Sequence, residues 1–441
     1  MYPGLSLDQA PPILVPFRFF LTAPVFGILA SLFAFYYGSD LLGSRWLPSM
    51  LALTHLFTLG VLSMVMIGAL FQMLPVVAGS AIAFESRVSI VVYLLLTTGT
   101  SLLTFGFYQR SSLLIFIASI AIGFSLILFI VAATHALWRA PRRHDSVRGM
   151  QFAIIGGLST TVVLGLILAL GHAWDDIPLW REQLTPLHIL WGTLGWISLL
   201  VGVIAYQVVP MFQMTPEYPS VLRRYWAGSL FGLLIVASLV IFSSPSLLLI
   251  THTLLALLLV VFAVITLRLQ RLRKRRLPDV TLNFWRMGMV ALIAAVGVYQ
   301  FNSVWPQPRF ELLIGTLFTL GFTLSVINGM LYKIVPFLVW LHLQNHLLAT
   351  MQLGKIRIPN MKEIIPSNLL KRQFWVHLSA LGLLILAVIV GDPLFRPAWG
   401  LFVISFSLLG YNLLFAYRCY RRELKRISEL ADNPLNHSPL P

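Results

Sequence analysis

The chain has 441 residues, of which 58% are hydrophobic and 10% are charged, and its mean hydropathy is +0.86. A soluble domain carries about 25% charged residues, so this chain has too little charge to cover a water-facing surface and must expose apolar side chains to lipid. The net charge is +16, but its basic residues lie in short runs at the ends of apolar segments. That placement argues against nucleic-acid binding. Cys419 is the only cysteine, which excludes an intrachain disulfide and a cysteine-based metal site.

Twelve apolar segments, each of about 20 residues or more, predict membrane-spanning helices, because that length crosses about 30 Å of hydrocarbon. The spans are expected at roughly 13–37, 48–79, 88–108, 112–137, 150–172, 186–214, 221–242, 246–270, 281–301, 311–341, 373–391 and 396–418. The fold class is therefore all-α and polytopic. We expect a single transmembrane domain over residues 1–426 and a disordered cytoplasmic tail over residues 427–441.

Loop charge predicts the topology, because Lys and Arg concentrate in cytoplasmic loops. Basic residues follow the fourth, sixth, eighth and tenth spans: Arg139, Arg142, Arg143 and Arg148; Arg223 and Arg224; Arg271, Arg273, Lys274, Arg275 and Arg276; Lys355, Arg357 and Lys362. The alternate loops are poor in basic residues, and one of them carries Asp175, Asp176 and Glu182. Both termini are then cytoplasmic, and a bacterial cytoplasmic (inner) membrane is the expected location.

One sequence pattern recurs on the second, sixth and tenth spans. A Thr-Leu-Gly triplet is followed by a second glycine and then by a proline, always fifteen residues after the first glycine. The three sets are Gly60, Gly68 and Pro75; Gly195, Gly202 and Pro210; Gly321, Gly329 and Pro336. The recurrence predicts three four-helix units, at about residues 13–137, 150–270 and 281–418, related by a pseudo-threefold arrangement.

The residue types in this pattern suggest helix packing. Glycines let neighbouring helices approach closely. The prolines are expected to close the repeat helices at the cytoplasmic boundary. Lys333, one turn before Pro336, is expected to reach the interface with its ammonium group.

Carboxylates are almost confined to loops and span ends, and Glu311, at the start of the tenth span, comes closest to an exception. Proton-coupled transporters keep an ionisable acid inside the membrane. The lack of such an acid near mid-membrane in this sequence weighs against proton-coupled transport.

Histidines are the other candidates for chemistry. His55, His172, His188 and His252 are expected in the outer halves of their spans, whereas His377 and the rest are expected in loops or at the cytoplasmic interface. A histidine inside a membrane is costly without a partner and is a candidate ligand for haem iron or copper. The alternative is a histidine that only bonds a neighbouring hydroxyl group.

His55 and His188 stand out because each precedes the Thr-Leu-Gly triplet of a repeat helix. His55 lies three residues before its threonine and His188 lies five residues before. Two residues turn a helix by about 200°, so both rings face inward only if one helix is locally irregular.

Twelve spans in three four-helix units, with histidines in the outer halves of spans two and six, resemble the haem–copper oxidase subunit I architecture. Within it, the chain most resembles the NnrS-like membrane proteins of the nitric-oxide response. The resemblance implies that His55 is a haem ligand, that His188 is a copper ligand, and that His252 is a further ligand. The family's histidines on spans seven and ten are missing; Gly315 and Thr316 stand where the latter are expected. A complete oxygen-reducing centre is therefore not expected.

Three hypotheses follow for the function. The first is a protein that binds haem b or copper through His55 and His188, without oxygen reduction, and serves nitric-oxide tolerance, electron transfer or metal handling. The second is a metal-free permease that uses the three-unit arrangement as a pathway. The third is a scaffold or assembly subunit that binds other respiratory-complex subunits, or a homo-oligomer, within the lipid bilayer.

Overall fold

The structure, a computed structural model, describes residues 11–141, 145–174, 181–274, 279–352, 356–391 and 393–431, and within them it contains helices and no strand. This confirms the expected all-α membrane fold. Several residues used in the topology argument lie outside the described residues: Arg142, Arg143, Asp175, Asp176, Arg275, Arg276 and Lys355.

The helices join end to end into twelve rods within the described residues, four to each unit. The first unit consists of α1 (Leu14–Tyr37) with the 3₁₀ turn η1 (Gly38–Leu42); α2 (Pro48–His55), η2 (Leu56–Ser63), α3 (Met64–Met73) and η3 (Leu74–Ala78); α4 (Glu85–Gln109); and α5 (Ser112–Trp138). The second consists of α6 (Asp145–Gln151), η4 (Phe152–Leu158) and α7 (Ser159–Ala173); α8 (Arg181–Leu190), η5 (Trp191–Ser198) and α9 (Leu199–Gln213); α10 (Ser220–Val240); and α11 (Pro245–Arg271). The third consists of α12 (Val280–Val304); α13 (Pro308–Thr316), η6 (Leu317–Thr323) and α14 (Leu324–Ala349); the short α15 (Met361–Ile364); α16 (Ser367–Val390); and α17 (Phe395–Ala431).

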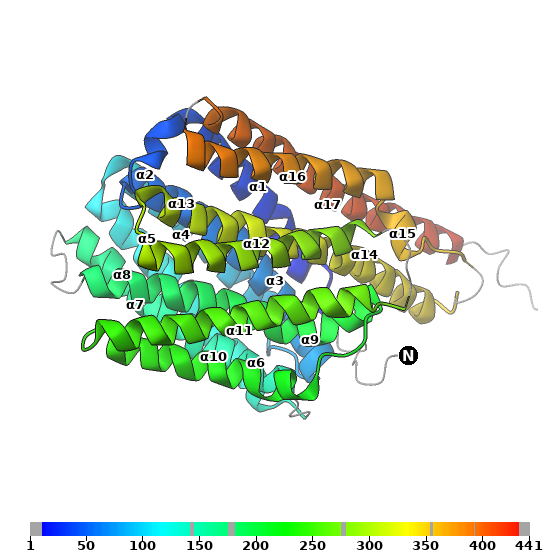
Figure 1. Ribbon diagram of the computed structural model, residues 1–441. Helices are drawn as coiled ribbons and strands as arrows, with labels where there is room; N and C mark the ends of the chain where they lie inside the picture. The colour runs from blue at the N-terminus through cyan, green and yellow to red at the C-terminus, as the bar shows by residue number, and fades with distance from the viewer. Residues whose placement is uncertain are drawn as a thin grey trace, which may run out of the picture.

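Eleven of these rods are long and apolar enough to cross a membrane. The exception is α10, whose first turns carry Arg223 and Arg224 and shorten its apolar stretch. It is nevertheless 21 residues long and lies beside α11 in the bundle (Figure 1). Large apolar side chains such as Ile120, Phe124 and Val131 stand exposed along the outer helices, as a lipid-facing surface requires.

Both ends of the described chain lie at the same end of the bundle, which agrees with an even number of crossings. The His342 Nε2 lies 3.0 Å from the Pro11 carbonyl oxygen, and Arg426 near the end of α17 donates to the Arg357 carbonyl (2.6 Å). We call this end of the bundle the inner end and the opposite end the outer end.

The second rod of each unit lies at the centre of the bundle. These three rods are 94%, 67% and 61% buried over their most apolar windows, against 50% or less for every other candidate span. Their inner halves pack together, and Phe212 and Phe337 bring the second and third units into contact (ring centroids 6.0 Å apart). Their outer halves diverge and leave a central space.

Each central rod contains a π-helical segment at its Thr-Leu-Gly triplet: η2, η5 and η6. The backbone therefore repeats the irregularity that the sequence repeats. The glycine of each triplet packs against the first rod of its own unit. Gly60 touches Phe26, Gly195 touches Gly157, and Gly321 touches Ala291.

Three expectations from the sequence were wrong. Pro336 does not close its helix, because α14 continues to Ala349 with the proline inside it. His377 is not interfacial; it is fully buried in α16, where its Nε2 lies 3.2 Å from the hydroxyl of Ser325. Residue 427 does not start a disordered tail, because α17 runs to Ala431 with Ile427 buried; residues 432–441 lie outside the described residues.

Candidate functional site

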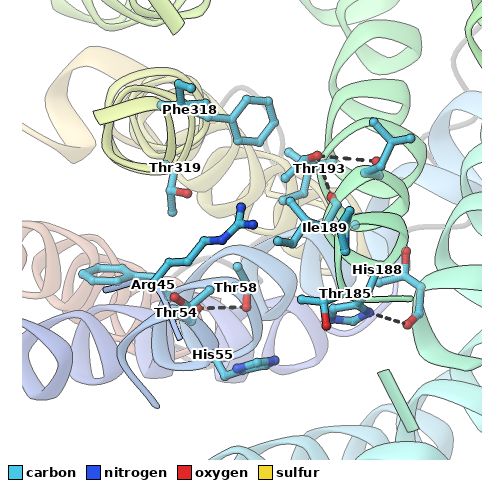
Figure 2. Close-up of a pocket in the computed structure, with 18 of the residues that line it drawn as sticks. Arg45, Thr54, His55, Thr58, Thr185, His188, Ile189, Thr193, Phe318 and Thr319 are labelled. Atoms are coloured by element: carbon cyan, nitrogen blue, oxygen red, sulfur yellow. Dashed lines mark hydrogen bonds between the residues drawn. The ribbon is translucent and has the colours of Figure 1, made fainter. Parts of the chain in front are cut away.

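A cavity of about 660 Å³ occupies the outer half of the bundle between the three diverging central rods. This volume lies within the range of about 300–1,000 Å³ that is usual for small-molecule and cofactor sites. Leucine, isoleucine and phenylalanine side chains form most of the wall. The polar lining residues are Arg45, Thr54, His55, Thr58, Ser63, Ser119, Thr161, His172, Arg181, Thr185, His188, Thr193, His252, Tyr299, Asn302, Glu311, Thr316 and Thr319. Figure 2 shows Arg45, His55 and His188 among the residues that line it.

His55 and His188 face this one cavity and lie next to each other. Their ring centroids are 6.3 Å apart and their ring planes differ by 20°. His55 is at the end of α2 and His188 is in the last turns of α8, so the pair joins the first and second units immediately before their π-helical segments.

The hydrogen bonds of the two rings determine which nitrogen carries the proton. His55 donates from Nδ1 to the Leu51 carbonyl (2.8 Å), and His188 donates from Nδ1 to the Thr161 carbonyl (3.0 Å). A carbonyl oxygen can only accept, so Nδ1 bears the hydrogen in both rings. The neutral rings then present an Nε2 lone pair, which has no protein partner among the described residues. A backbone carbonyl on the second nitrogen is the usual support of a metal-ligating histidine.

The third histidine of the cavity, His172, has the same arrangement, with Nδ1 donating to the Leu168 carbonyl (2.8 Å). The Phe107 ring lies beside it and also beside His55, with ring centroids 6.0 Å and 5.7 Å away. One edge of the cavity is therefore a row of aromatic rings from His172 through Phe107 and His55 to His188.

The two rings meet although they lie at different distances from their triplets. His55 is on the side of its rod that faces the second unit, and His188 is on the side of its rod that faces the first. The three central rods are equivalent helices arranged around one axis, and neighbouring rods contact each other through different faces. Two histidines that meet between neighbouring rods must therefore point in different directions on their own helices. Gly165 gives His188 its room, since a Cβ there would lie 2.8 Å from the ring.

His252 lines the same cavity from α11 but has its own partner. The hydroxyl of Tyr299 on α12 lies 2.6 Å from His252 Nδ1. The third unit contributes no histidine, and Gly315 and Thr316 line the cavity where ligands would be expected.

A charged group that the sequence analysis did not identify lies at the outer part of the cavity. The Arg45 guanidinium contacts the Glu311 carboxylate (3.2 Å) and lies 4.9 Å from the centre of the Trp46 ring. Arg181 approaches the same ring at 5.3 Å. Arg45 extends into the space between the central rods (Figure 2). Two arginines and one carboxylate leave this part of the cavity positively charged.

The set of donors limits which metals the site suits. Within the described residues, no three or more His, Cys, Asp or Glu side chains are grouped closely enough to hold a metal ion. A zinc or copper site normally takes three or four protein ligands, whereas haem iron needs only one or two.

In comparisons with known proteins, no protein family matches the chain and no curated protein is significantly similar to it.

Proposed function

We propose that this protein is an integral membrane haem protein in which His55 and His188 would hold haem b in the outer cavity. The single observation that carries the proposal is the pair of imidazoles, each fixed through Nδ1 and each left with an Nε2 lone pair beside one apolar cavity. In keeping with the basic inner end, we place it in a bacterial cytoplasmic membrane with both termini in the cytoplasm.

The spacing of the rings supports this assignment. Two imidazole nitrogens about 2 Å on either side of one metal ion put the ring centres about 6 Å apart. The ring centroids of His55 and His188 are 6.3 Å apart. The centroid spacing of the pair therefore agrees with two imidazoles that share one iron.

The rest of the cavity lining suits the macrocycle and the substituents of haem. Its leucine- and phenylalanine-rich walls match an apolar macrocycle, and the positive charge of Arg45 and Arg181 matches carboxylate substituents. Copper is the weaker candidate, because the described residues offer no third ligand beside the pair.

When bound, haem would supply one-electron chemistry, and His55 and His188 would both be engaged in holding its iron. The buried pair of rings would hold the iron, and the apolar wall would exclude water from it. We therefore favour electron transfer over catalytic reduction of oxygen, and nitric-oxide tolerance and metal handling stay as alternative roles.

The test is the visible absorption spectrum of the detergent-purified protein, air-oxidised and dithionite-reduced, with the haem content per chain. We expect a Soret band, reduced α and β bands, and about one haem per chain. A colourless protein from haem-replete cells would overturn the proposal.

A second candidate, a permease, is favoured by one observation. The outer cavity lies between the three central rods, and the rods close against one another at the inner end. A colourless protein that carries a solute in proteoliposomes would select it, and co-purification with respiratory subunits would select the scaffold hypothesis.

A further inference from the structure

A second pocket, of about 460 Å³, lies at the inner end of the third unit. It is formed by the start of α12, by the first turns of α16, and by Arg273 just beyond the end of α11. The pocket is separate from the outer cavity and shares no lining residue with it.

Three cationic side chains line this pocket: Arg273, Arg286 and Lys371. Asp279, the one carboxylate among the described lining residues, is already engaged. Asp279 accepts a hydrogen bond from the Lys333 ammonium (2.8 Å) and two more from the backbone N–H and the hydroxyl of Thr281 (3.0 and 2.7 Å).

These contacts keep Asp279 ionised and paired. Burial by itself would raise the pKa of this carboxyl, but the Lys333 charge and the hydrogen bonds outweigh burial and hold the pKa below its ordinary value. Since Lys333 balances Asp279, the charges of Arg286 and Lys371 give the described lining of the pocket a net positive charge.

The remaining wall is apolar and lies where a membrane boundary would be. Val280, Leu282 and the buried Phe374 contribute carbon surface. The Trp375 ring meets the Phe374 ring edge-on (ring centroids 5.4 Å apart) and is 61% exposed on the outside of α16. Tryptophan is enriched at the level of lipid head groups, so its exposed ring indicates that the pocket opens toward lipid.

We propose that this pocket binds the phosphate head group of an anionic phospholipid, with its acyl chains running along the Phe374–Trp375 side of α16. A basic pocket between membrane helices, with an apolar wall and an interfacial tryptophan, matches both parts of such a lipid. A free phosphate ion would use the three cations but would gain nothing from Trp375.

The experiment is native mass spectrometry of the full chain in mixed micelles of phosphatidylcholine and phosphatidylglycerol. We expect the wild type to retain one phosphatidylglycerol in preference to phosphatidylcholine. The variant Arg273→Gln/Arg286→Gln/Lys371→Gln should lose this preference, with binding about fivefold weaker for each charge removed. Trp375→Ala, which keeps every charge, should also weaken lipid binding.

The control variant, Arg87→Gln/Arg421→Gln/Lys425→Gln, removes three exposed charges outside the pocket and should bind lipid as the wild type does. Inorganic phosphate is tested separately by calorimetry. Equal loss of lipid in the pocket and control variants, no preference in the wild type, or tight phosphate binding that Trp375→Ala leaves unchanged would each overturn the proposal. If the triple variant does not give a monodisperse protein, the single variant Lys371→Gln decides. None of these outcomes depends on whether haem is bound in the outer cavity.

Discussion

The imidazoles of His55 and His188 lie with their ring centroids 6.3 Å apart across the boundary between two structurally repeated units. The first ring is oriented by its own helix, through the Leu51 carbonyl, and the second by the neighbouring α7, through the Thr161 carbonyl. Two rings held from different helices keep their spacing only while α7 and α8 keep their packing. The site is therefore sensitive to small changes in α7.

Gly165 on α7 gives one way to move His188 without altering any ligand. A methyl group added at Gly165 would lie 2.8 Å from Cε1 of the His188 ring and must displace it. We expect Gly165→Ala to reduce haem occupancy at least about threefold, read from the Soret absorbance per chain, since a displacement of a few tenths of an ångström misplaces a ligand.

The matched control for this variant is Gly232→Ala on α10, where an added Cβ meets nothing within 4 Å. Alanine favours a helix over glycine by about 0.5–1 kcal/mol, so both variants should stay folded. Equal occupancy in the two variants would show that the position of His188 does not matter for haem.

The crossing of η4 and η5 depends on two facing glycines. A Cβ at Gly157 would overlap the carbonyl oxygen of Gly195, and backbone cannot swing away as a flexible side chain can. We expect Gly157→Ala to destabilise the protein by about 1–3 kcal/mol, seen as a lower midpoint in thermal unfolding. Gly297→Ala on α12, where an added Cβ meets nothing within 4 Å, should leave the midpoint the same or raise it.

The Asp279–Lys333 pair predicts a pH dependence of stability. The pKa of Asp279 is lowered in the folded protein, so its contribution is complete above the ordinary carboxyl pKa of about 4 and is lost as the pH falls through the folded value. The unfolding midpoint should therefore drop between about pH 5 and pH 3. Asp279→Asn should be less stable at pH 7, by about 2 kcal/mol, and its midpoint should change less over this range. Parallel curves for the two proteins would contradict this account.

His252 provides a test of how many histidines bind iron. Because Tyr299 occupies its Nδ1 and the pair already supplies two ligands, we expect His252→Ala and Tyr299→Phe to leave the Soret and α-band positions unchanged. A shift of the α band in His252→Ala, with Tyr299→Phe unaffected, would instead make His252 a ligand.

The all-α fold and eleven of the twelve spans could be predicted because lipid leaves only a few options for a long apolar segment. The twelfth segment, α10, is a helix of 21 residues as expected, but Arg223 and Arg224 make it less apolar than the eleven candidate spans. Helix ends were harder to predict. A proline such as Pro336 removes one hydrogen bond, and the surrounding packing on α14 is sufficient to continue the helix past it.

The repeat could be predicted from spacing, but its π-helical form could not. A π-helical turn holds one more residue than an α-helical turn, and the types of the residues in it do not reveal this. The buried state of His377 was also missed, because its position near the start of its span suggested the interface. The side chain instead packs between Phe284 and Phe402 and reaches Ser325.

At the site, the sequence identified the two histidines but not their relation. The two histidines differ by two positions in their distance from the Thr-Leu-Gly triplet, which corresponds to a rotation of about 200° around the helix. This difference argues against a shared cavity only if both rings are assumed to point toward one common axis. Arg45 and Glu311 were missed as a pair, since they are 266 positions apart in the sequence and only the packing of the first unit against the third brings them together. The position of Glu311 at the start of its span was the only sequence signal.

The most direct test of the central claim is low-temperature electron paramagnetic resonance of the oxidised protein, compared between the wild type, His55→Ala and His188→Ala. Two imidazoles on one iron predict a low-spin ferric signal in the wild type and a high-spin signal, or loss of haem, in each variant. His135→Ala, at an exposed histidine near the end of α5, should keep the wild-type signal. A high-spin wild type, or a low-spin signal that survives in both variants, would contradict the assignment of His55 and His188 as the ligands.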